Sequence, residues 1–252
     1  EPDTRYLTYQ KVGTDPGPLL FTPDSLGGLR LFNETQEWLS DSGIDVTIPF
    51  DTKLPGTKVW SGLPAKFKAG WNYNFRSRTF NQRRFRFQAN TQTQNLALPA
   101  EDLFAPNQIG PGGAMVVEDT LPTDSFDGTE KILAYYGMLE LPIIRDRLRL
   151  VGGLREEQSR IRLNTTVFNE GTLCDPDDTI CDVTIDLDDN NLLPGVALIY
   201  SPRDDMNVRF GFGKTVSRPE LRELAPTEFP AARGQLSQFG NPSLVQSLWT
   251  SY

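Results

Sequence analysis

The sequence has no histidine among its 252 residues. Without an imidazole, the chain cannot form a Ser-His-Asp or Cys-His catalytic arrangement, or a zinc site with histidine ligands. It also lacks any run of about 18 apolar residues, so no segment predicts a transmembrane helix. No secretory leader begins at Glu1, which indicates a processed chain or an excerpt of a longer one. We therefore expect a non-enzymatic chain with no catalytic residues, no cofactor and no metal.

Basic residues and cysteines are also few. The chain has 25 Lys and Arg against 33 Asp and Glu, a net charge of -8, which argues against a nucleic-acid partner. The two cysteines, Cys174 and Cys181, lie in an acidic segment. In an oxidising compartment they would close a small loop as a disulfide. Two free surface thiols are the alternative, because the loop is short.

The clearest pattern present is the alternation within 65–87, AKFKAGWNYNFRSRTFNQRRFRF. Odd positions from Ala65 to Phe75 are apolar or aromatic, and even positions from Lys66 to Arg78 are basic, amide or glycine. A period of two predicts a β-strand, and this run far exceeds the usual five or six residues. So long a strand with two different faces is typical of one that crosses a bilayer and continues beyond it. Lipid then lies on one side and an aqueous lumen on the other.

The rest of the chain supplies neighbours for this strand. Other extended segments are predicted at 5–11, 30–50, 131–142, 147–163, 192–200, 206–214 and 241–252, for about eight strands in all. Helical turns are expected at 99–104 and 219–224. Short links at 143–146 and 202–205 alternate with long ones at 88–128, 164–190 and 217–240. This order predicts an all-β, antiparallel up-and-down transmembrane barrel with long extracellular loops. A Greek-key sandwich would place long and short links at both ends.

Two phrases near the C-terminal end resemble a known family. Ser217–Leu224 (SRPELREL) and Gly240–Leu244 (GNPSL) are similar to the SRPxFREL and GNPxL phrases of TonB-dependent outer-membrane receptors. The segments 66–87 and 134–154 are similar to the same family, so the resemblance covers most of the chain from about Phe50 onward. It implies a β-barrel in the bacterial cell outer membrane, surrounded by the lipid bilayer and without enzymatic activity.

The resemblance also implies a function and partners. Members import scarce nutrients such as ferric siderophores, cobalamin or glycans, with energy from the TonB complex. The family has an N-terminal plug domain, a TonB-contacting segment and a barrel of about 22 strands. No plug-like sequence is present here, so we expect residues 1–252 to be a portion of the barrel domain. Contact with TonB would run through the missing plug segment, and the imported ligand is not identified by the sequence.

Two other functions are open from the sequence. One is a complete small outer-membrane barrel of about eight strands, acting as an adhesin or structural protein. An independently closed barrel would resist heat in a gel-shift assay, and an excerpt would not. The other is a soluble secreted β-domain that binds or cleaves carbohydrate. Solubility without detergent would favour it, because its apolar strand faces would then be buried internally.

Five arginines gather toward the outer end of the longest strand: Arg76, Arg78, Arg83, Arg84 and Arg86. We place them on or near the lumen face, because an arginine facing lipid at mid-membrane costs about 2–4 kcal/mol. As an electropositive wall they would attract an anionic ligand such as a ferric siderophore. The alternative is that they pair with lumen carboxylates such as Glu140 and Glu157, or with the plug.

Two further groups of residues have alternative roles. The acidic run from Asp175 to Asp189 would suit calcium, but it lacks EF-hand spacing, and a solvated acidic loop is favoured. Six aromatic residues belong either to the girdles at the two membrane–water interfaces or to a core. They are Trp60, Trp71, Tyr73, Tyr135, Tyr136 and Tyr200.

Overall fold

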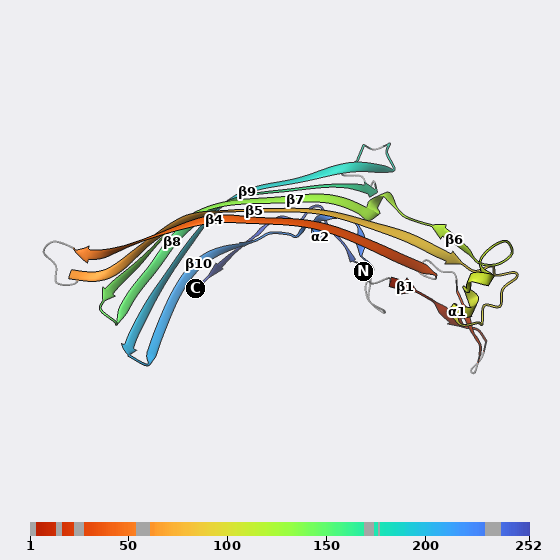
Figure 1. Cartoon of the computed structure of the whole chain (residues 1–252), viewed down its shortest axis with the longest axis horizontal. Helices are drawn as coiled ribbons and strands as arrows, with labels where there is room; N and C mark the ends of the chain where they lie inside the picture. Colours follow the sequence, from red (N-terminus) through yellow and green to blue (C-terminus); the bar gives the residue numbers. More distant parts are fainter. Residues whose placement is uncertain are drawn as a thin grey trace.

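The computed structural model describes residues 4–13, 17–22, 28–53, 61–168, 174–175, 177–229 and 238–252. Its main feature is a nine-stranded antiparallel sheet with the path β1-β4-β5-β7-β8-β9-β10-β13, in which β6 pairs with β5. Figure 1 shows the long strands as one curved arch, with α2 on its concave side. The expected all-β antiparallel architecture is confirmed.

The strands of this sheet are β1 (Thr4–Tyr6), β4 (Leu29–Lys53), β5 (Ser61–Gln88), β6 (Met115–Glu118), β7 (Ser125–Ile144), β8 (Leu148–Phe168), β9 (Ile180–Arg203), β10 (Met206–Ser217) and β13 (Ser247–Ser251). Two short hairpins pair β2 (Tyr9–Lys11) with β3 (Leu19–Phe21), and β11 (Glu228–Phe229) with β12 (Gln238–Phe239). The helical turns are α1 (Ala100–Leu103), η1 (Pro106–Gln108), η2 (Pro122–Asp124) and α2 (Leu221–Leu224). Among the described residues, no helix has the length and apolarity needed to cross a membrane.

The short links are tight turns, as the sequence predicts. Between β7 and β8 the chain reverses over Arg145–Arg147, where Asp146 has a φ of 57°. Asp tolerates this left-handed conformation better than most residues. Between β9 and β10 only Asp204 and Asp205 lie outside the strands.

Several predicted boundaries are wrong. Most of the segment 164–190 is strand and not loop, because β8 continues to Phe168 and β9 begins at Ile180. β7 begins at Ser125, six residues before the predicted start. The segment 5–11 forms parts of two strands, β1 and β2. Along β8 the apolar residues change from even to odd positions, and along β9 from odd to even, so simple alternation ends where the strand does not.

A compact apolar core lies at the end of the sheet away from the short turns. It consists of Phe80, Phe126, Ile161, Leu163, Ile185, Leu221, Leu224 and Ala225. The Phe80 and Phe126 rings are stacked with centroids 5.3 Å apart. Strands β5, β7, β8 and β9 supply one side of this core, and α2 supplies the other. The segment after β10 therefore folds back over one face of the sheet.

Candidate functional site

The strand register decides which side chains share a face. We call the face covered by α2 the inner face and the opposite one the outer face. Inner-face residues are even-numbered on β5 and β7, and odd-numbered on β4, β8, β9 and β10. Side chains of one face form a continuous wall, because neighbouring strands lie about 4.8 Å apart.

Near the short turns the outer face is apolar and open. Phe67 and Trp71 keep 38% and 36% of their surface exposed, and no second layer of described residues covers them. We call these outer-face residues of six strands the outer band: Ile44–Phe50, Phe67–Phe75, Leu133–Leu141, Leu148–Leu154, Leu192–Tyr200 and Met206–Phe212. On β9 the band spans eight steps of about 3.3 Å, or about 26 Å. Because the strands of a membrane barrel are tilted by about 40°, this length spans about 20 Å along the membrane normal, close to the apolar belt of about 25 Å.

Beyond the outer band, the same strands reverse their polarity. The outer face now carries ion pairs, since Arg160 binds Asp188 and Arg162 binds Asp186. The inner face carries the buried apolar core. No register shift separates the two halves of the β5–β7 or β8–β9 pairs, so the reversal comes from the sequence and not from a bulge. Hydrocarbon outside one half and water outside the other would produce this change.

Four of the six predicted girdle aromatics lie on the outer face: Trp71, Tyr73, Tyr135 and Tyr200. Tyr136 lies on the inner face, so its place in a girdle is excluded by the register. Its hydroxyl donates a hydrogen bond to Asp45, which also pairs with Lys68 at 3.2 Å. Gly70 makes room for this group, because a Cβ there would lie 2.5 Å from Asp45 Oδ1. Trp60 lies outside the described residues.

The structure places the predicted arginines Arg76 and Arg78 on the inner face. Arg76 lies 3.6 Å from carboxylate oxygens of both Glu37 and Glu130, and Arg78 donates a hydrogen bond to Glu37. Glu37 comes from β4 and Glu130 from β7, so a carboxylate of each neighbouring strand faces β5. These partners differ from Glu140 and Glu157, which were expected from the sequence.

Arg84 is the most buried of the five predicted arginines. It is 9% exposed and donates to both oxygens of Asp124, at 2.7 and 2.6 Å, while Asp124 is fully buried. A third hydrogen bond, of 2.7 Å, joins it to Glu228. Burial alone would lower the pKa of Arg84, but its bonds to Asp124 and Glu228 outweigh burial and raise the pKa. Gln82 donates to Asp124 as well, at 3.1 Å.

The prediction that Arg83 lies on or near the lumen face is wrong, because adjacent residues of a strand point to opposite faces. It lies on the outer face, where it pairs with Glu118 at 3.0 Å. Arg86 lies on the inner face and pairs with Asp119 at 2.8 Å. Every one of the five predicted arginines therefore contacts a carboxylate. The sequence hypothesis of ion pairing describes them better than that of a free cationic wall.

The two carboxylates expected to face these arginines bind other partners. Glu140 accepts a hydrogen bond of 2.8 Å from Arg149. Glu157 is shared by Arg155, at 2.6 Å, and Arg218, at 2.8 Å. Both carboxylates lie on the inner face. Arg218 reaches Glu157 from the segment that follows β10, which the alternation pattern alone could not show.

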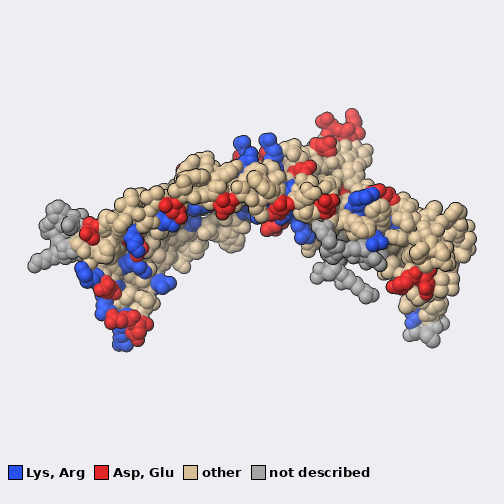
Figure 2. All heavy atoms as spheres, in the orientation of Figure 1, with Lys and Arg blue, Asp and Glu red and all other residues tan. Residues whose placement is uncertain are grey.

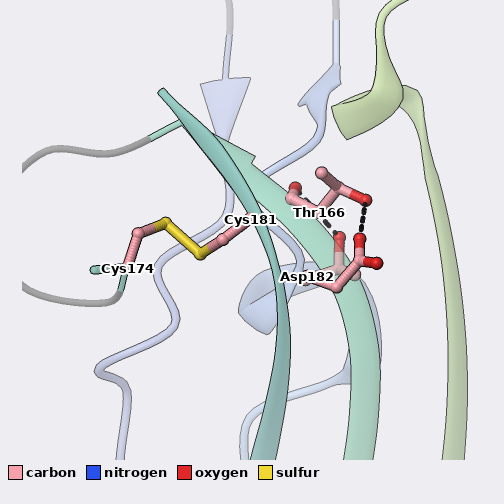
Figure 3. Close-up of a disulfide and its surroundings, with 5 residues drawn as sticks. Thr166, Cys174, Cys181 and Asp182 are labelled. Carbon is pink, nitrogen blue, oxygen red and sulfur yellow. Dashed lines mark hydrogen bonds between the residues drawn. A yellow bond between two sulfur atoms is a disulfide. The ribbon is translucent and has the colours of Figure 1, made fainter. Parts of the chain in front are cut away.

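The cysteines and the acidic run lie at the opposite end of the β8–β9 hairpin from the short turns. Cys174 and Cys181 form a disulfide with an S–S distance of 2.04 Å, beside the hydrogen bond between Thr166 and Asp182 (Figure 3). Asp182, Asp186 and Asp188 are residues of β9, and each faces a partner on β8. The acidic run is therefore largely strand and not loop. In the part of the chain described, no three His, Cys, Asp or Glu side chains converge as metal ligands.

On the face shown in Figure 2, Lys and Arg side chains are interspersed with Asp and Glu side chains along the arch. The paired inner wall, the apolar outer band and the up-and-down sheet define a wall of an outer-membrane β-barrel. The chain matches the family described as TonB dependent receptor-like, beta-barrel, over residues 3–246. It therefore belongs to this family of outer-membrane receptor barrels.

One solved structure similar to the chain is that of the ferric-catecholate import receptor Fiu from K12 E. coli, in its closed form. The identity is 14% and the TM-score 0.32, and the match covers 76% of this chain and 31% of that receptor. The chain thus spans about a third of that receptor's length. No curated protein matches the chain.

Sequence reasoning missed most of the inner-face carboxylates that bind the arginines: Glu37, Asp119, Asp124, Glu130 and Glu228. A signal for two of them is present in the sequence. Once β4, β5 and β7 are aligned as antiparallel neighbours, Glu37 falls opposite Arg78, and Glu130 opposite Arg76. Asp124 and Glu228 lie outside that alignment, in a helical turn and in the segment after α2.

Proposed function

We propose that this chain is a portion of the barrel domain of a receptor that imports a scarce nutrient, such as a ferric siderophore, cobalamin or a glycan. The observation that carries the proposal is the match over residues 3–246 to the receptor barrel family. The outer band supports it, because apolar side chains on six neighbouring strands suit contact with hydrocarbon. The plug domain and the segment that contacts TonB would lie outside these residues.

In the proposed mechanism, the chain supplies a wall and no chemistry. The long loops would capture the ligand, which would then pass through the lumen as the plug is displaced. Energy would come from the TonB complex on the periplasmic side. The inner-wall arginines would keep the wall in shape through their carboxylate partners, since fully paired cations attract an anionic ligand only weakly. A ligand-attracting role would require one of these pairs to open.

An uptake experiment tests this function. The gene for the full receptor is deleted, and growth is measured with a panel of ferric siderophores, cobalamin and glycans as limiting nutrients. We expect one class to require the receptor, and only in cells with an intact TonB system. Uptake that persists without the TonB system, or a panel with no dependent nutrient, would contradict the proposal.

A second experiment tests the small-barrel alternative. Residues 1–252 are folded into detergent and compared by gel shift before and after heating. We expect no heat-resistant fast-migrating form, because the described β1 and β13 end the sheet path and do not pair with each other. A stable heat-modifiable form would favour a complete small barrel. The uncovered outer band disfavours a soluble β-domain that binds or cleaves carbohydrate. Folding of residues 1–252 without detergent would favour that alternative.

A further inference from the structure

We call the segment Arg218–Phe229 the strap. It crosses the inner face of the sheet at the end away from the short turns. It begins where β10 ends at Ser217 and contains α2 and β11. On α2, Leu221 and Leu224 are fully buried, while Arg222 and Glu223 between them are exposed. This spacing of three residues directs one side of the turn onto the sheet and the other toward the lumen. The strap thereby forms a second layer inside the wall.

The strap is held at both ends by charged contacts. At its start, Arg218 donates to Glu157 at 2.8 Å and to Ser159 at 2.9 Å, both on β8. Toward its other end, Glu228 accepts a hydrogen bond of 2.7 Å from Arg84 on β5. The β8, β7 and β5 strands lie side by side. At about 4.8 Å per strand, the strap bridges about 10 Å of wall between these anchors.

The contacts between the two anchors are tight. A Cβ added at Gly128 on β7 would lie 2.8 Å from Leu221 Cδ2, so glycine permits this close approach. Thr227, which is fully buried, donates to the backbone oxygen of Thr123 at 2.8 Å. On its lumen side, the strap is tied to the next part of the chain, because the Asn241 backbone N–H donates to the Glu223 carbonyl at 2.6 Å.

We infer that the strap is a fixed part of the receptor's inner wall and does not detach from the sheet while the receptor works. Detachment would expose the shared apolar core to water and would remove a partner from the buried Arg84. Any opening of the outer mouth must then come from other extracellular segments. The inference rests on the proposed import function, since it specifies which part of the wall stays in place.

Thiol labelling in intact cells tests the inference. Leu224→Cys and Ala225→Cys place a thiol at fully buried positions of the strap, and Arg222→Cys places one at an exposed position of the same turn. The native cysteines form a disulfide and contribute no free thiol. Each variant of the full receptor is treated with a membrane-impermeant maleimide, in energised cells and in cells treated with a protonophore. Receptor without an added cysteine gives the background.

We expect Leu224→Cys and Ala225→Cys to react at least about tenfold more slowly than Arg222→Cys in both conditions, because a closed core must open before a thiol reacts. Labelling of both buried positions at the rate of Arg222→Cys in energised cells would overturn the inference. Ala225→Cys guards against a packing defect at position 224, because it changes the core volume less. Labelling does not require a known cargo, so the absence of uptake in the nutrient panel would count against the proposed function alone.

Discussion

The long strands have a lower half, near the short turns, and an upper half, beyond the outer band, and the two halves have opposite polarity patterns. Near the short turns, apolar side chains point outward and charged ones inward, as with Trp71 and Arg149. Beyond the outer band, Arg160 and Asp188 point outward while Ile161 and Leu163 are buried inside. The backbone pairing is continuous through both halves. A strand's polarity pattern therefore reports its surroundings, and the point of reversal marks where those surroundings change from hydrocarbon to water.

The largest expected effect comes from opening the buried charge pair inside the upper half. Asp124→Ala leaves Arg84 buried without its main partner, which costs about 3–5 kcal/mol of unfolding free energy. Urea unfolding of the receptor measures the loss. The control is Asp188→Ala, which removes a carboxylate from the exposed Arg160 pair and should change stability little. Equal losses in the two variants would contradict the distinction between inside and outside.

Truncating one leucine on each face of the sheet compares the buried core with the outer band. Leu163→Ala truncates a fully buried side chain of the upper core and should cost about 2–5 kcal/mol. Leu139→Ala makes the same change on the outer band, where Leu139 is exposed. Lipid chains can fill the space at that position, so a smaller loss is expected. Unfolding in lipid vesicles compares the two variants, and a larger loss for Leu139→Ala would be inconsistent with lipid contact.

A charge placed on the outer face locates the bilayer. Trp71→Arg puts a guanidinium in the middle of the outer band and should cost about 2–4 kcal/mol in a membrane. Thr79→Arg adds the same charge on the same face of β5, beyond the band and beside Asp127, and should be tolerated. Trp71→Leu controls for the lost aromatic ring. The measurement is the fraction of each variant that folds in lipid vesicles. If Trp71→Arg folds as well as the unchanged receptor, the outer band does not contact the bilayer.

The smallest expected effect is a pH dependence at the exposed outer pairs. The hydrogen bond from Arg160 holds the pKa of Asp188 below its usual range. Its stabilising effect is therefore present above the ordinary carboxyl pKa of about 4, and is lost as pH falls through the lowered value. The melting temperature of Asp188→Asn should lie slightly below that of the unchanged receptor at pH 7, and the difference should shrink as the pH falls below about 4. A difference that grows toward pH 3 would reverse the assigned sign.

Sequence reasoning found the lower half of the long strands but missed the upper ends of β7, β8 and β9. In the lower half, apolar and polar residues alternate with a fixed parity, as in Phe67–Phe75, and the strand was predicted there. In β9 the apolar parity changes between Leu187 and Leu192, and the acidic residues before that change suggested a loop. The five arginines were found from composition and spacing, but Arg83 was assigned to the wrong face.

The sequence by itself determined the strands that alternate, the outer band and the family, because period-two spacing and local phrases are properties of neighbouring residues. The tertiary structure alone decided which carboxylate meets which arginine and which inner surface the strap covers. Those contacts join residues far apart in the chain, such as Arg84 and Glu228, 144 positions apart. Such a pair depends on where a segment folds back across the sheet, and no local pattern encodes that path.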